Sequence, residues 1–149
     1  MQHWTPITVD DLAQVFDARE LETLQDAAHE ACVSDILADA VAVVREAIDN
    51  NPSNTLDADT TTIPRTLRGT ALDLIAIRLL KRFALVVTDE RRQAADQAQA
   101  KLDAIARAEF RVISPDGTIP VPDYMRPEIV APSPAYGNDG GTWYPTPNA

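Results

Sequence analysis

Apolar residues recur with helical spacing between Val33 and Ile48. Intervals of three and four positions place one apolar stripe along a helix. The members of this stripe are Val33, Ile36, Leu37, Ala40, Val41, Val44, Ala47 and Ile48. Two asparagines and Pro52 follow, and they predict that the helix ends near residue 49.

Two shorter helical patterns precede this segment. The run from Thr8 to Asp11 resembles a capping box, so we expect a helix to open there with Leu12 and Phe16 facing inward. A second short helix is predicted over residues 19–28, because its leucines have the spacing of one helix face.

Two longer helices are predicted further along the chain. Pro64 suits the first turn of a helix that continues to residues 83–87. The apolar residues of this segment occupy nearly the whole circumference of the predicted helix, so we expect the helix at the centre of the fold. Thr88 caps the next helix, which extends to about Phe110 and has mostly alanine on its inward side.

The pattern changes after this helix. Residues 111–114 and 118–121 predict two short strands around a Pro-Asp-Gly turn. From Pro122 onward, prolines keep the chain extended and no helical or strand period is present. The predicted fold is therefore mainly α: a compact bundle of about four helices with a short C-terminal β-hairpin in residues 1–121, and an extended Pro-rich tail in residues 122–149.

The tail also contains large apolar side chains that a plain spacer does not need. Such side chains on an extended segment are typical anchors for a partner surface. Together with two arginines of the last helix, they form the predicted partner-binding set: Tyr124, Met125, Ile129, Tyr136, Trp143, Tyr144, Arg91 and Arg92. The alternative is a tail in which the aromatic residues are incidental.

Charge is unevenly distributed along the chain. The net charge is -10, yet residues 1–63 contain 13 acidic and 2 basic side chains, whereas residues 64–114 contain 6 acidic and 10 basic ones. A strongly acidic protein binds phosphate backbones poorly. Two halves of opposite net charge favour head-to-tail contacts between copies, and such contacts can close into rings. The alternative is a soluble surface with local salt bridges.

No set of residues predicts catalysis or a cofactor. His29 and Cys32 are three residues apart, but no third group orients them, and His3 lies in an N-terminal end that we expect to be frayed. Asp57 and Asp59 have calcium-loop spacing without the glycine and glutamate of that motif. Residues 1–110 contain a single glycine, so no phosphate-binding loop is present. We expect no enzyme activity, metal, cofactor or membrane span.

The order and spacing of five stretches resemble a known family. They are Ile7–Leu12, the acidic, alanine-rich helix that ends at Ile48 and Asp49, Ile63–Arg68, Ile75–Leu80 and the charged, alanine-rich helix Asp89–Glu109. Over roughly residues 7–121 the chain resembles the small head–tail connector (adaptor or neck) proteins of tailed phages, including those of Mu-like prophages. The loop after the second long helix lacks a tyrosine- and arginine-rich segment of many members, and the tail is longer.

The resemblance implies a structural virion protein of the neck of the particle, present in the host cytoplasm during assembly. It implies a homo-oligomeric ring of about twelve copies that docks on the portal protein and contacts downstream neck or tail proteins. DNA would pass through the lumen only as cargo. The alternative function is a soluble helical binding or regulatory module with a proline-rich partner-binding tail.

Overall fold

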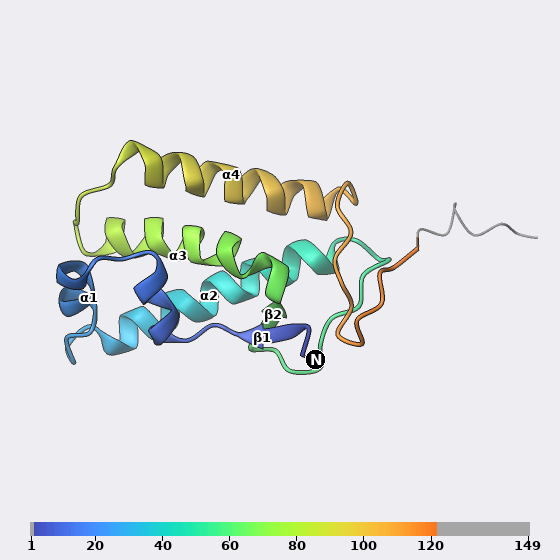
Figure 1. The fold of residues 1–149 in the computed structure, drawn as a ribbon, viewed down its shortest axis with the longest axis horizontal. Coiled ribbons are helices and arrows are strands. Elements are labelled where there is room, and N and C mark those ends of the chain that lie inside the picture. The colour runs from blue at the N-terminus through green and yellow to red at the C-terminus, as the bar shows by residue number, and fades with distance from the viewer. Residues whose placement is uncertain (1, 122–149) are drawn as a thin grey trace, which may run out of the picture.

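The computed structural model describes residues 2–121 of the 149-residue chain and is mainly helical (Figure 1). In chain order the elements are β1 (Trp4–Pro6), the 3-10 helix η1 (Val9–Gln14), α1 (Ala18–Leu24), α2 (Glu30–Asp49), β2 (Thr62–Pro64), the 3-10 helix η2 (Arg65–Leu67), α3 (Arg68–Arg82) and α4 (Asp89–Ala106). The predicted bundle of about four helices is confirmed by α1 to α4 within residues 2–121.

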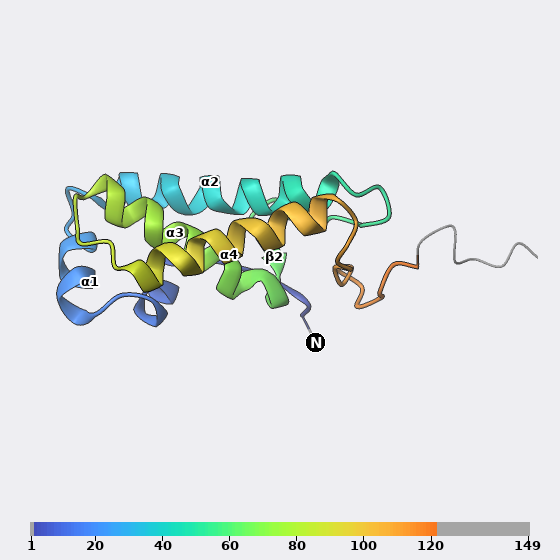
Figure 2. The ribbon, with the colours of Figure 1, turned by 90° about the horizontal axis from the view of Figure 1, so that it is seen from above.

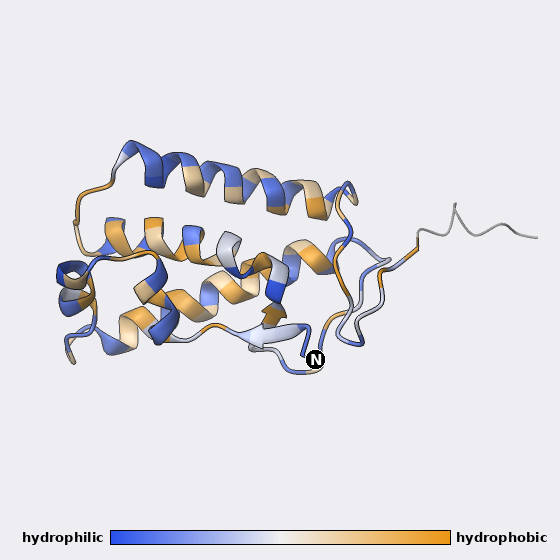
Figure 3. Ribbon diagram, viewed as in Figure 1, coloured by the Kyte–Doolittle hydropathy of each residue, from blue (hydrophilic) through white to orange (hydrophobic). Residues whose placement is uncertain are grey.

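Helices α2, α3 and α4 pack against one another pairwise and run along the long axis of the molecule (Figures 1 and 2). The predicted stripe of α2 is buried, except that Ile36 is only partly covered. Figure 3 shows apolar residues concentrated on α2 and α3, whereas α4 is polar along much of its length. Helix α3 packs on both α2 and α4 and is buried along most of its length, which confirms its predicted place at the centre.

The start of α3 differs from the prediction by four residues. Pro64 is extended, with ψ at 132°, because it ends strand β2, and the short helix η2 separates it from α3. The predicted capping box at the N-terminal segment does form, with the Asp11 carboxylate accepting the Thr8 N–H at 2.9 Å. It opens a 3-10 helix rather than an α-helix.

Two alanines in the left-handed conformation end α3 and α4. Ala84 has φ at 52° and Ala108 has φ at 63°. At each end a backbone N–H reaches back to the last turn, from Leu85 to the Leu80 carbonyl and from Glu109 to the Ala104 carbonyl, both at 2.9 Å. This is the helix-ending motif that usually uses glycine. It ends α4 before Phe110, because the reversed backbone cannot continue the helix.

The predicted C-terminal β-hairpin is wrong. Its turn exists, because the Ser114 N–H donates to the Thr118 carbonyl at 2.8 Å and Gly117 has φ at 85°. No strand forms on either side of it within the described residues. The segment packs on the helical body instead, with Val112 and Ser114 buried.

The two-stranded sheet is formed by two segments that are far apart in sequence. Strands β1 and β2 pair antiparallel, with Trp4 opposite Pro64, Thr5 opposite Ile63 and Pro6 opposite Thr62. Sequence periodicity could not reveal strands of three residues each, because an alternating apolar–polar pattern can be recognised only over a longer run.

The N-terminal segment is part of the core, so the expectation of a frayed end is wrong. Trp4 is only 1% exposed. Its indole Nε1–H donates to the Ile113 carbonyl at 2.9 Å, and the Arg45 guanidinium lies 5.6 Å from the centre of its ring. Trp4 thereby joins β1 to α2 and to the segment that follows α4.

We expect Trp4→Phe to lower the free energy of unfolding by about 1–3 kcal/mol, because it leaves the Ile113 carbonyl without its donor. Urea unfolding monitored by far-ultraviolet circular dichroism measures this. Phe110→Leu is the control, since Phe110 is 52% exposed and its replacement should change stability by less than about 0.5 kcal/mol. Equal stabilities for Trp4→Phe and the wild type would contradict the assigned role of the indole.

Candidate functional site

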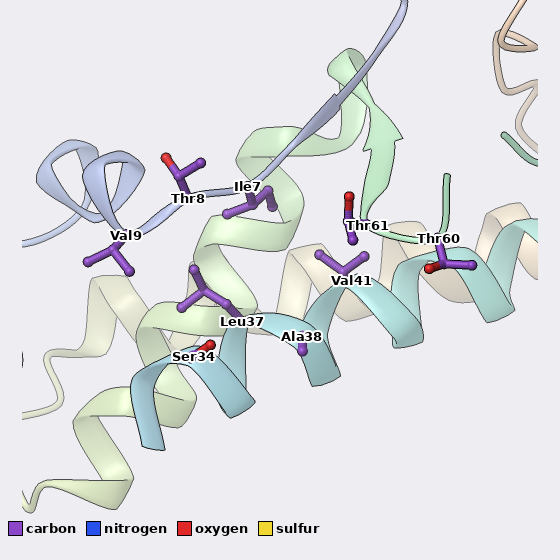
Figure 4. Close-up of a pocket in the computed structure, with 9 residues that line it drawn as sticks. All are labelled: Ile7, Thr8, Val9, Ser34, Leu37, Ala38, Val41, Thr60 and Thr61. Atoms are coloured by element: carbon purple, nitrogen blue, oxygen red, sulfur yellow. The ribbon is translucent and has the colours of Figure 1, made fainter. Parts of the chain in front are cut away.

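A recess of about 530 Å³ lies between the segment after β1, one face of α2 and the loop before β2 (Figure 4). Its lining residues are Ile7, Thr8, Val9, Ser34, Leu37, Ala38, Val41, Thr60 and Thr61. None of these side chains is an acid or a base that titrates near neutral pH. The recess therefore offers apolar and hydroxyl contacts, but no general acid or base.

A second recess, of about 220 Å³, lies beside α3 and the first turns of α4. It is lined by Val15, Asp73, Ala76, Glu90, Arg91 and Ala94. Asp73 is half-buried, and this burial raises the pKa of its carboxyl group. Among residues 2–121, none donates a hydrogen bond to Asp73 or forms an ion pair with it. A carboxylate that is partly desolvated without a compensating donor is a candidate for binding.

Arg91, one of the predicted partner-binding residues, is engaged within the chain. Its guanidinium donates two hydrogen bonds to the Glu20 carboxylate, at 2.6 and 2.8 Å, and one to the Val15 carbonyl at 3.1 Å. It also lies 5.4 Å from the centre of the Phe16 ring. Sequence analysis missed this tie between α1 and α4, because the two residues are 71 positions apart.

The same ion pair shifts the pKa values of both of its members. Hydrogen bonding from Arg91 lowers the pKa of Glu20, and hydrogen bonding to Glu20 raises the pKa of Arg91. Arg92, the neighbouring predicted partner residue, is exposed and lies 3.6 Å from Asp89 on the same helix face. Arg92 is thus more accessible than Arg91, and the partner-binding role of both stays a prediction.

Two further arginines connect distant parts of the body. Arg68, in the first turn of α3, forms an ion pair with the buried Asp11 carboxylate. Arg45 donates to the carbonyls of Asp57 and Thr62, both at 2.7 Å, and to that of Asp59 at 2.9 Å. It therefore holds the loop before β2 against α2.

The carboxylates of that loop are used for local turns. Asp57 accepts the Thr62 hydroxyl at 2.8 Å, and Asp59 accepts the N–H and hydroxyl of Thr61 at 2.9 and 2.7 Å. The bonds from Thr61 lower the pKa of Asp59. Within residues 2–121 no group of three or more histidine, cysteine, aspartate or glutamate side chains could hold a metal ion.

The His29 ring is occupied by contacts other than Cys32. Its Nδ1 donates to the Thr23 carbonyl at 2.9 Å, and the ring lies 4.5 Å from that of Phe83. These contacts tie the start of α2 to α1 and to the end of α3. Cys32 is a free, partly buried thiol.

The other predicted partner-binding residues lie outside the described part of the chain. These are Tyr124, Met125, Ile129, Tyr136, Trp143 and Tyr144. No helix in the described part is long and apolar enough to cross a membrane.

Comparison with known proteins identifies the family. A family model described as "Bacteriophage Mu, Gp36" matches residues 7–127, which is most of the chain. The chain belongs to this family. It is therefore a phage protein, which agrees with the expected relation to Mu-like prophages. No curated protein and no solved structure matches it.

We expect Arg91→Ala to lower the free energy of unfolding by about 1–2 kcal/mol, because it removes the bidentate, partly buried ion pair with Glu20. Arg92→Ala is the matched control and should cost less than about 0.5 kcal/mol, because its ion pair is exposed. Urea unfolding at pH 7 compares the two Gp36-family variants.

This difference should depend on pH in a defined direction. The pKa of Glu20 is lowered from its ordinary value near 4.5 by Arg91. Its contribution to stability is therefore present above pH 4.5 and is lost as the pH falls through the folded-state pKa. A cost of Arg91→Ala that stays constant down to pH 2 would contradict this assignment.

Asp73→Asn should raise the melting temperature at pH 7. The pKa of Asp73 is raised from its ordinary value near 3.8 by burial, so its charged form destabilises the folded state at neutral pH. The penalty is absent below the unfolded-state pKa and grows as the pH rises through the folded-state pKa. Thermal unfolding at pH 7 and pH 3 measures this, with Asp96→Asn on the exposed side of α4 as the control.

Proposed function

We propose that this Gp36-family chain is a structural virion protein without enzyme activity. It forms a homo-oligomeric ring that serves as a head–tail connector, docks on the portal protein and links the capsid to downstream neck or tail proteins. DNA passes through the lumen of the ring as cargo. The family membership supports a role in phage biology, and the charge of α2 and the lining of the recess beside it support the connector.

The observation that carries the proposal is the acidic, exposed face of α2. Its five acids are all exposed: Glu30, Asp35, Asp39, Glu46 and Asp49. The single base of this helix, Arg45, gives its donors to the backbone carbonyls of the loop before β2. A face of this charge repels the phosphate backbone, so DNA can slide along it without binding. We therefore assign α2 to the channel side of the ring.

The recess of Figure 4 also fits a binding role better than a catalytic one. Its lining combines aliphatic side chains such as Leu37 and Val41 with hydroxyls such as Ser34. Contacts of this kind suit protein surfaces, whereas catalysis of proton transfer needs a group that titrates near the working pH.

Electron microscopy of particles assembled with this chain tests the connector. The expected image is a ring of copies beneath the portal, with α2 facing the channel. The proposal fails if purified particles lack the chain, or if it is present there without forming a ring. Capture of a separate SH3-like protein by the tail, with no attachment to particles, would favour the alternative of a helical regulatory module.

The predicted tail anchors allow a sharper test. Replacing both Trp143 and Tyr144 by alanine should leave the melting temperature within about 1–2 °C of the wild type, yet weaken binding to the portal at least tenfold, since aromatic anchors dominate such contacts. Asn148→Ala is the control in the same segment. Unchanged binding of the double variant, measured by biolayer interferometry with the full chain, would remove these two residues from the docking surface.

A further inference from the structure

We propose that the recess at Asp73 receives a basic side chain from the end of α3 in a second copy of the chain. The contact is head-to-tail, since the acidic recess and the basic group are different surfaces of one subunit. It deepens the proposed ring by naming the residues that join its copies, and it rests on that function only for closure into a ring.

Asp73 differs from the carboxylates that pair with distant arginines within residues 2–121. Asp11 has Arg68 as its donor, and Glu20 has Arg91. Asp73 is also partly withdrawn from water, but burial is the only cause of its shifted pKa. A cation placed beside it would offset a cost that the isolated subunit pays.

The lining of the recess combines apolar walls with carboxylates. Ala76, Ala94 and Val15 form small, apolar walls, and Glu90 adds a second carboxylate. The remaining lining residue, Arg91, has its charge matched by Glu20 at 2.6 Å. Apolar walls accept the methylene stem of a lysine or arginine, while carboxylates bind the charged end. The recess therefore fits a basic side chain better than an acidic or an apolar one.

A group of bases lies at the C-terminal end of the same helix. The last turns of α3 hold Arg78, Lys81 and Arg82. Lys81 and Arg82 are exposed, and among residues 2–121 no acid pairs with any of the three. Phe83 and the end of α3 pack on the start of α2 through His29, so these bases are held on a rigid element rather than on a loop.

The geometry of a helix places the two surfaces apart. At about 100° per residue, Arg82 lies about 180°, Arg78 about 140° and Lys81 about 80° around α3 from Asp73. A closed ring needs two different contact faces on each subunit. An isologous dimer, by contrast, would have to bring the recess and the bases of each copy into one shared patch.

A charge-swap experiment with the full chain tests the contact. One variant carries Asp73→Lys, and the other carries Lys81→Glu with Arg82→Glu. Each alone should lose self-association at least tenfold, because like charges then face each other. Mixing the two should restore it, since each contact between a copy of one variant and a copy of the other again joins opposite charges. Sedimentation equilibrium at 0.05 and 0.5 M salt measures the association, which should weaken at high salt.

The controls separate this contact from general charge effects. Asp96→Lys on α4 has the same change in net charge as Asp73→Lys, and it should associate as the wild type does. Circular dichroism of each variant establishes that the fold is retained. Asp73→Asn is the second test: it should weaken association while raising the melting temperature, a combination that a purely structural aspartate does not produce.

Three results would overturn the contact. They are a mixture that associates no better than its components, an Asp73→Asn variant that associates as the wild type does, and a wild-type chain that stays monomeric at millimolar concentration. None of these decides the connector itself, because the image of the assembled particle tests the ring independently. A ring seen beneath the portal with Asp73 facing away from its neighbours would reject this contact and retain the proposed function.

Discussion

Burial of the Trp4 side chain connects parts of the chain that are far apart in sequence. The indole donates to the Ile113 carbonyl across 109 positions, and Arg45 of α2 covers its ring. A buried indole needs a partner for its N–H, so its burial also positions the segment after α4. Strand β1, strand β2 and that segment are each too short to be stable alone. Their placement therefore depends on this one residue and the contacts around it.

Arginine ties bring the acidic and basic parts of the chain together. The first 63 residues contain 13 acids and 2 bases, and two of these acids, Asp11 and Glu20, are matched by Arg68 and Arg91 of the later part. Part of the uneven charge, which indicated contacts between copies, therefore forms ion pairs within a single copy. The acidic face of α2 and the three bases at the end of α3 are not used in these ties, and they are the basis of the functional proposals.

The helices could be predicted because their signals are local. The stripe of α2, the Thr88 cap of α4 and the asparagines after residue 49 act through neighbours within one or two turns. The hairpin prediction failed for the opposite reason. The turn at Gly117 is local and does form, but Val112 and Ser114 find cover on the helical body, so no ladder is needed between the two arms. The sequence predicts Arg91 as a surface residue, because its partner, Glu20, lies 71 positions away and leaves no local signal.

By itself, the sequence determined the number, approximate limits and buried faces of the helices, the central place of α3 and the uneven charge, because periodicity, capping and composition are properties of short segments or of the whole chain. Only the tertiary structure decided that Trp4 lies in the core. It also decided which arginines form ion pairs within the subunit, and that Asp73 has no hydrogen-bond donor among residues 2–121. Each of these depends on which distant residues meet, and a one-dimensional pattern contains no distances between them.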